Sequence, residues 1–157
     1  MKKEYSYGAL LYFRYEWVQY FIMVWAIRKG WIIEYGFPKG HPEASDTCIK
    51  DTVIREIEEE TGISQDKLLV DNFDDKTTAF SLQYEIEKKW ETILKTSTYY
   101  AIEMKEIHHQ TVLPVPADFV HEIHDIRMIE WDKVYTSLTH KDEKILFKEW
   151  LMWANKL

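Results

Sequence analysis

The pattern of hydrophobic positions in the first part of the chain predicts β-strands. Residues 5–14 and 17–28 are rich in aromatic and β-branched residues, and a short polar break at residues 15–16 separates them. We therefore expect two strands joined as a hairpin. Residues 31–34 favour another short strand, whereas residues 36–40, with two glycines and a proline, predict a break in regular structure.

The hydrophobic spacing then becomes helical. Apolar residues recur there at every fourth position: Ile49, Val53 and Ile57. This spacing places them on one side of a helix, which can pack on a sheet. Asp46 or Thr47 is suited to cap the N-terminus of that helix, and Gly62 is suited to its left-handed C-terminal cap. The pattern therefore predicts a helix from about residue 47 to residue 61.

The remainder of the chain mixes strand-like and helical stretches. Strand composition recurs at residues 67–70, 77–86, 96–104 and 127–131. Residues 108–117 contain two prolines and are expected to form a loop. Residues 141–157 place one apolar stripe along a helix: Leu146, Trp150, Trp153 and Leu157. Together these elements predict an α/β (α+β) fold, a mixed β-sheet sandwiched between α-helices.

Composition limits the class of protein. A chain of 157 residues with 46% hydrophobic residues fits a single domain spanning residues 1–157. One cysteine, Cys48, and a start without an apolar signal segment favour a reducing, cytoplasmic location. The longest apolar stretch, residues 21–27, falls short of the roughly 20 residues of a membrane span, so we expect no membrane insertion.

Charge adds a second constraint. The formal net charge of −7 argues against long nucleic acid as a partner, so any polyphosphate has to be bound locally through cations. The oligomeric state is left open by the sequence.

Three glutamates share one face of the predicted helix. At about 100° per residue, Glu60 lies roughly 40° from Glu56, and Glu59 lies about 60° from Glu56 on the other side. Like charges four residues apart repel by a few tenths of a kcal/mol, which favours a cation among them. Magnesium combines a few carboxylates with water and substrate phosphate, as this face allows. A run of glutamates alone is more often a solvated acidic face.

Residues 55–63 read Arg-Glu-Ile-Glu-Glu-Glu-Thr-Gly-Ile. They match the second half of the Nudix box, in which a Gly, five residues, a Glu and seven residues precede this pattern, so the segment resembles the Nudix hydrolases. Gly40 matches the opening glycine, and Asp46 stands where the family has its Glu. Eight residues separate Asp46 from Arg55, so counting back from Arg55 puts Thr47 at the acidic position instead.

The resemblance implies a Nudix fold and a magnesium-dependent hydrolase in which manganese can substitute. It implies that Glu56, Glu59 and Glu60 bind the metal together with the carbonyl of Gly40. Glu56 or a neighbouring glutamate is then expected to activate the attacking water. Arg55 is implied to orient the carboxylates through charge-assisted hydrogen bonds.

Segments outside the box resemble the bis(5′-nucleosyl)-tetraphosphatases, which split diadenosine tetraphosphate asymmetrically. The discriminating run is Pro-Lys-Gly-His at residues 38–41. This likeness implies that Lys39 and His41 bind substrate, that Tyr99 stacks on adenine and that Glu122 faces the metals from outside the box. Three of these positions also have a structural alternative. Lys39 could be a solvated loop cation, Tyr99 a core tyrosine and Glu122 a surface glutamate.

Other functions stay open at this point. The alternatives are an RNA 5′-pyrophosphohydrolase, another small-nucleotide pyrophosphatase, or a non-catalytic Nudix domain that senses a nucleotide. RNA enzymes of this superfamily tend to have Pro-Gln-Gly-Gly at residues 38–41, and sensing domains usually lose box carboxylates. The expected partner is a small-molecule dinucleoside polyphosphate or nucleotide, whose nucleoside and phosphate chain length the sequence does not choose.

Overall fold

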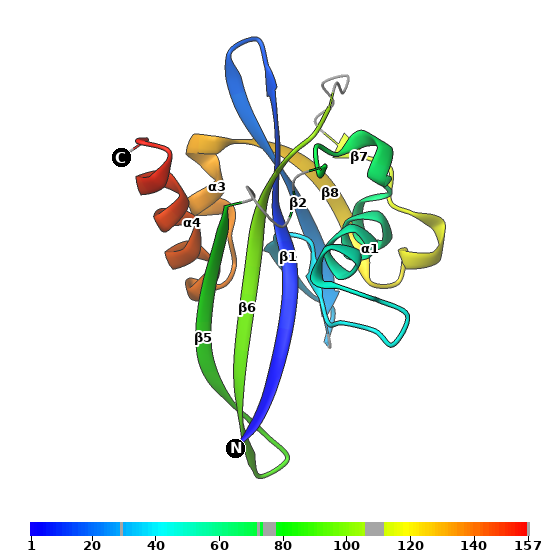
Figure 1. Ribbon diagram of the computed structural model, residues 1–157, viewed down its shortest axis with the longest axis vertical. Coiled ribbons are helices and arrows are strands. Elements are labelled where there is room, and N and C mark those ends of the chain that lie inside the picture. Colours follow the sequence, from blue (N-terminus) through cyan, green and yellow to red (C-terminus); the bar gives the residue numbers. More distant parts are fainter. Residues whose placement is uncertain (29, 72, 74–77, 106–111, 157) are drawn as a thin grey trace.

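The computed structural model describes residues 1–157 except 29, 72, 74–77, 106–111 and 157. Within this part of the chain, an eight-stranded sheet lies between helix α1 (Ile49–Thr61) on one face and helices α3 (Trp131–Ser137) and α4 (Lys141–Trp153) on the other (Figure 1). The predicted fold class is confirmed. None of the described helices is long and apolar enough to cross a membrane.

The sheet is mixed. Its strands are β1 (Lys2–Tyr15), β2 (Val18–Arg28), β3 (Ile32–Gly36), β4 (Lys39–Gly40), β5 (Ala79–Lys88), β6 (Glu91–Glu103), β7 (Val112–Leu113) and β8 (Ile123–Glu130). Their order is β5-β6-β1-β2-β8-β7, with β3 beside β2 and β4 beside β1. Strands β1 and β6 run parallel and the other pairs are antiparallel. The ribbon β5-β6-β1 extends beyond the helices in the lower part of Figure 1.

The sheet splits between β1 and β2, and the split contains the segment that leads to the box. The C-terminal end of β1 pairs with β2, whereas Tyr7 and Gly8 in its middle pair with β4. A Cβ on Gly8 would lie 2.3 Å from the Pro38 carbonyl oxygen, so only glycine allows this approach. The Ala9 N–H then donates to that carbonyl at 3.0 Å. This close packing fixes the position of residues 36–40.

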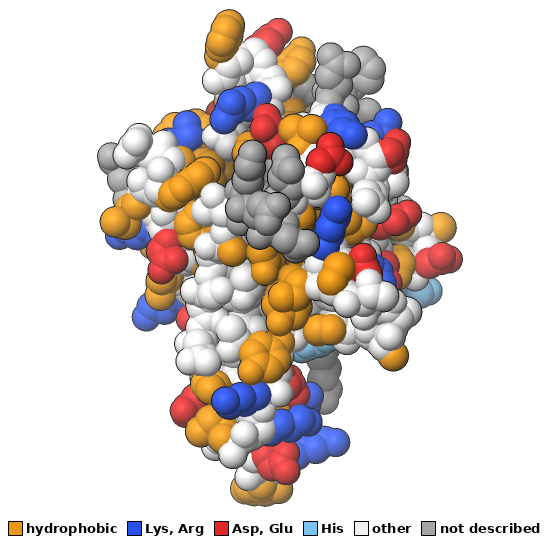
Figure 2. Space-filling view, viewed as in Figure 1, with side chains coloured by type: hydrophobic (Ala, Val, Ile, Leu, Met, Phe, Trp, Pro, Cys, Tyr) orange, Lys and Arg blue, Asp and Glu red, His pale blue; other side chains and the backbone are white. Residues whose placement is uncertain are grey.

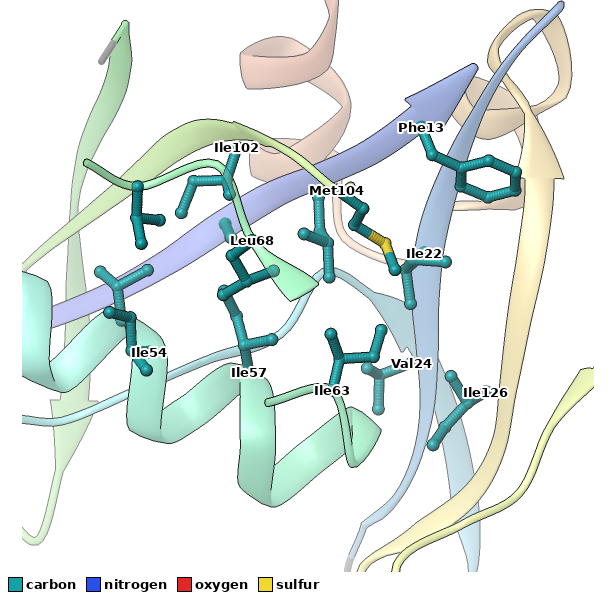
Figure 3. Close-up of a cluster of buried hydrophobic side chains, with 14 of the residues drawn as sticks. Phe13, Ile22, Val24, Ile54, Ile57, Ile63, Leu68, Ile102, Met104 and Ile126 are labelled. Carbon is teal, nitrogen blue, oxygen red and sulfur yellow. The ribbon is translucent and has the colours of Figure 1, made fainter. Parts of the chain in front are cut away.

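A first hydrophobic cluster lies between α1 and the sheet. Val53 and Ile57 are fully buried, and Figure 3 shows Ile54 and Ile57 on the side of α1 that faces the sheet. Burial of one such side chain contributes about 1.5–3 kcal/mol to folding. Ile49, which the spacing places on the same face, is 40% exposed. That part of the prediction is wrong because Ile49 is the first residue of α1 and precedes the turns that pack on the sheet.

A second cluster lies between the opposite face and α4. The α4 residues at its centre are almost fully buried: Leu146, Phe147 and Trp150. The rings of Phe147 and Trp150 meet the Phe21 ring edge-on, with centroids 5.2 and 4.7 Å away. Trp153 is 55% exposed although it was predicted on the same stripe, because the last residue of α4 lies at the margin of the packed face. Leu157 lies outside the described residues.

Other differences from the predicted elements involve short segments. Residues 67–70, predicted as a strand, belong to the 3-10 helix Gln65–Lys67 and to a single bridge between Leu68 and Met104. Residues 36–40 were predicted to be irregular but contain the end of β3 and all of β4. Within the predicted loop 108–117, β7 pairs with β8 and a second 3-10 helix, Ala117–Phe119, begins; residues 108–111 are outside the described part. Helix α3 was not predicted.

The two isoleucines of α1 provide a test of this packing. Ile57→Ala should lower the free energy of unfolding by about 2–5 kcal/mol, because it leaves a cavity beneath the helix. Ile49→Ala removes the same atoms from an exposed site and should change the free energy of unfolding by less than about 0.5 kcal/mol. Urea denaturation of both variants measures the difference. Similar losses in the two variants would contradict the packing described here.

Candidate active site

The site is built on the C-terminal turns of α1. Gly62 has φ = 74° and its N–H donates to the Glu58 carbonyl at 2.8 Å, which confirms the predicted left-handed cap. At the N-terminal end of α1, the N-cap residue is Cys48 and no side chain caps the helix. The prediction that Asp46 or Thr47 caps this end is therefore wrong. Thr47 instead donates its N–H and its Oγ1 hydrogen to Asp51, at 3.0 and 2.5 Å. Asp46 has a different partner, Arg55.

Arg55 is the centre of a hydrogen-bond network that joins the loop before α1 to the helix. Its Nε and Nη2 donate to the two carboxylate oxygens of Asp46, at 3.1 and 2.9 Å. Nη1 donates to Glu56 at 2.8 Å and to Glu59 at 3.2 Å, and Nη2 also donates to the His41 carbonyl at 2.8 Å. Bidentate pairing fixes orientation as well as distance. The loop before α1 is therefore attached to the acidic face of the helix.

Asp46, rather than Thr47, is the residue that pairs with Arg55. Besides binding Arg55, its Oδ2 accepts the Glu43 N–H and the Thr52 hydroxyl, each at 2.9 Å. The hydrogen bond from Arg55, followed by that from the Glu43 N–H, holds the pKa of Asp46 well below its usual range. The same contact raises the pKa of Arg55. The one-residue insertion before Arg55 leaves this ion pair intact.

The glutamates of α1 are brought close together. Glu56 is buried, and its burial raises its pKa although Arg55 opposes the shift. Glu60 is half-buried and accepts the Lys39 N–H at 3.4 Å. Burial, and then the negative charge of Glu56, raise the pKa of Glu60 to about 8. Glu59 likewise contributes to the raised pKa of Glu56, and carboxylates that disfavour one another's charge in this way form a site where a cation is favoured.

Gly40 lies directly against this acidic face. A Cβ on Gly40 would be 2.0 Å from Oε1 of Glu56, so a larger residue would displace the Glu56 carboxylate from this position. Among the described residues, no three His, Cys, Asp or Glu side chains form a preformed metal site, and Arg55 holds both Glu56 and Glu59. The donors available are nevertheless all oxygens, carboxylates and a carbonyl, which suit a hard divalent cation such as magnesium.

An open pocket lies beside Glu60. Its volume is about 390 Å³, with open solvent included. Its lining includes charged side chains from three parts of the fold: Lys39, Glu60 and Glu143. The lining also includes Glu34, whose Oε2 accepts the Arg28 Nε–H at 3.0 Å and lies 2.9 Å from His140 Nε2. The pocket is therefore adjacent to the acidic face and lined by charges of both signs.

The structure separates the other predicted site residues. Lys39 lines the pocket, whereas the exposed His41 ring donates from Nδ1 to the Tyr5 carbonyl at 2.9 Å. Glu122 lies in the turn before β8, where its carbonyl accepts the Ile27 N–H at 2.7 Å. Lys39 is thus beside Glu60 in the pocket, whereas the role of Glu122 stays a prediction.

Tyr99 requires a correction. It was expected to stack on adenine, but it is only 1% exposed and belongs to the core beneath α4. Its ring meets the Phe37 ring edge-on at 6.1 Å, and Nζ of Lys39 lies 5.7 Å from its centroid. Burial also raises the pKa of its hydroxyl well above the usual range. A ring enclosed in this way offers no face to a base, so the predicted role is wrong for this structure.

Glu143 is the site residue that the sequence reasoning missed. Its buried carboxylate accepts the Phe37 N–H at 3.2 Å and lies 3.6 Å from Nζ of Lys39. In the sequence it stands among charged residues in the first turn of a helix, where acidic residues commonly interact with the helix dipole. Nothing in that local pattern distinguishes a buried site residue from a surface glutamate.

Comparison with known families agrees with the helix geometry. The NUDIX domain model matches residues 16–151, which include the whole of α1 and the pocket residues around it. This chain belongs to the NUDIX domain family. A comparison with curated proteins finds no match. The segment from Gly40 to Ile63 accordingly corresponds to the Nudix box, and we propose that Asp46 takes the place of its first glutamate.

Several solved structures share the Nudix fold with this chain. A binary complex of the C. elegans Ap4A hydrolase superposes with a TM-score of 0.71 at 16% identity, covering 98% of this chain and 99% of that one. The NUDIX domain of Shewanella oneidensis NrtR, complexed with ADP ribose, has a TM-score of 0.67 at 12% identity and covers 98% and 90%. RenU, a Nudix hydrolase from M. smegmatis, has a TM-score of 0.63 at 14% identity and covers 100% and 90%. At these identities the likeness shows the fold.

The role of Asp46 in the Nudix box can be tested against its neighbour. Asp46→Asn removes the charge that orients Arg55 and should lower the rate of nucleotide hydrolysis by about 10–100-fold, as loss of an outer partner of a metal site does. Thr47→Ala removes only the exposed hydroxyl contact with Asp51, keeps the backbone N–H contact, and should leave the rate within about twofold. Initial rates of both variants decide between the two alignments of the box. A larger loss in Thr47→Ala would reverse the assignment.

The raised pKa of Glu60 predicts how stability depends on pH in the presence of chelator. The folded protein keeps a proton on Glu60 up to about pH 8, whereas the unfolded chain releases it near the ordinary value of 4.5. The folded state therefore binds more protons in this window, and the free energy of unfolding should fall as pH rises from about 4.5 to about 8. Glu60→Gln should flatten this dependence, measured by urea denaturation at several pH values. An unchanged slope would show that another group is responsible.

Proposed function

We propose that this chain is a magnesium-dependent Nudix hydrolase that cleaves a phosphoanhydride bond in diadenosine tetraphosphate and releases ATP and AMP. Manganese is expected to substitute for magnesium. The observation that supports the proposal most strongly is the position of Glu60. This carboxylate belongs to the acidic face of α1 and also lines a pocket that presents the cationic Lys39.

The residues of the box have separate roles in the proposed reaction. Glu56, Glu59, Glu60 and the Gly40 carbonyl would hold the metal, and one of these glutamates would accept the proton of the attacking water. Arg55 keeps two of the carboxylates oriented, and Asp46 keeps Arg55 in place. When bound, a divalent cation makes water more acidic and neutralises charge that develops on the phosphoryl group.

Two features support a dinucleoside polyphosphate as the substrate. The chain is similar in fold, over nearly its whole length, to a protein named as an Ap4A hydrolase. The pocket beside Glu60 also includes Tyr35 and Phe37 in its lining, and ligand pockets commonly combine such aromatic side chains with a few polar groups. This pocket replaces Tyr99 as the proposed location of one nucleoside. Water would then attack a fixed number of phosphates away, which makes the cleavage asymmetric.

Charge distribution supports a small substrate over long RNA. The net charge is −7, and on the face in Figure 2 the acidic and basic side chains are interspersed instead of forming a basic stripe. A nucleotide-sensing role, which the fold shared with NrtR keeps open, is less well supported because every box carboxylate is present. Binding without turnover would be its signature.

Product analysis tests the proposed function. With magnesium, diadenosine tetraphosphate should give equal amounts of ATP and AMP by chromatography, and excess chelator should abolish the reaction. Glu59→Gln and Glu60→Gln should each lower kcat by about 10²–10⁴-fold, the range of a lost general base or metal ligand. Two molecules of ADP as products, or a preference for triphosphorylated RNA, would contradict the proposed substrate.

Glu58→Gln is the matched control for these variants. It removes the same charge from the same helix, but the Glu58 side chain is exposed. Its kcat should therefore stay within about twofold of the unmodified protein. Full activity in excess chelator, or an equal loss in all three glutamate variants, would count against the acidic face as the reacting centre.

A further inference from the structure

We propose that Glu143 is a positioning residue of this site, which fixes residues 36–40 and holds the Lys39 ammonium ready for the phosphate chain of the substrate. The identity of that substrate rests on the proposed function, whereas the positioning contact does not. Glu143 reaches the site from α4, on the face of the sheet opposite to α1.

The carboxylate of Glu143 is buried and lies against two donors. Its side chain is 5% exposed, and a buried carboxylate is unfavourable unless donors surround it. Here Oε2 accepts the Phe37 N–H at 3.2 Å, and Oε1 lies 3.6 Å from Nζ of Lys39. Both donors belong to the segment that precedes the box. One carboxylate thus holds the backbone and a side chain of the same segment.

Gly36 makes this approach possible. A Cβ at Gly36 would lie 2.8 and 2.9 Å from the two oxygens of Glu143, so the carboxylate occupies the space that a side chain would need. Gly36 ends β3 opposite Val24 of β2, at the split in the sheet. The first turn of α4 is therefore packed against the backbone that lines the pocket.

Lys39 is restrained from both faces of the sheet. Its backbone N–H donates to Glu60 of α1 at 3.4 Å, while its ammonium pairs with Glu143 of α4. The ring of Tyr99 lies below the ammonium, with 5.7 Å between Nζ and the ring centroid. A long lysine side chain that is ordered before the substrate arrives does not have to be ordered during binding, which favours affinity.

These contacts predict a defect in binding without a defect in chemistry. Glu143→Gln keeps the shape of the side chain and an oxygen that can accept the Phe37 N–H, but it removes the charge that holds Lys39. The metal-binding carboxylates of α1 are unchanged in this variant. We therefore expect KM for diadenosine tetraphosphate to rise about tenfold, as for loss of one charge-assisted contact, with kcat within about twofold.

A double-mutant cycle with Lys39→Met tests the mechanism. If Glu143 acts through Lys39, the double variant should have a KM close to that of Lys39→Met alone, because the two losses are not additive. Glu149→Gln, on an exposed position of the same helix, is the matched control and should change neither constant. Additive effects, an unchanged KM in Glu143→Gln, or a fall in kcat alone would overturn the proposal.

Amide hydrogen exchange tests the contact without any substrate. In the free protein, Glu143→Ala should accelerate exchange of the Phe37 N–H by about tenfold or more, whereas Glu143→Gln should leave it slow. Equal exchange in the unmodified protein and the Ala variant would refute the positioning contact itself. If diadenosine tetraphosphate is not hydrolysed, the proposed function fails, and the kinetic cycle is carried out with the nucleoside polyphosphate that the protein does hydrolyse fastest.

Discussion

The pairing of Arg55 with Asp46 is the interaction on which the acidic face depends. A guanidinium presents five N–H donors in a rigid plane, so it can bind a carboxylate through two hydrogen bonds and still serve other acceptors. Here it binds Asp46, both Glu56 and Glu59, and the His41 carbonyl. A lysine could not make this set of contacts. Through this one side chain, the loop before α1 is fixed in position against the helix.

A second constraint is the close approach of backbones at the split in the sheet. Three glycines make room there, and each admits a different neighbour: Gly8 admits the Pro38 carbonyl, Gly36 admits Glu143, and Gly40 admits Glu56. Residues 36–40 thereby come into contact with carboxylates from helices on opposite faces. Because residues 37 and 39 contact Glu143 of α4 and Glu60 of α1, the geometry of the site depends on the packing of both helices.

Burial alters what individual side chains can do. Tyr99 is at a position where resemblance implied a base-stacking ring, yet it is enclosed with Phe37 beneath α4 and supports Lys39 instead. Glu143 is an ordinary helix-start glutamate in the sequence but becomes the partner of a backbone N–H more than a hundred residues away. Such roles depend on which surface a helix covers, and local pattern does not contain that information.

The features that local periodicity controls were predictable from the sequence alone. The β1–β2 hairpin, the position of α1 with its Gly62 cap, the shared face of the box glutamates and the apolar stripe of α4 follow from spacing along the chain. Tertiary structure decided the exposure of Ile49, the formation of β4 and β7, the pairing of Asp46 with Arg55, and the contact of Glu143 with Phe37. The physical reason is that periodicity fixes which residues share a face, whereas only long-range contacts determine what that face meets.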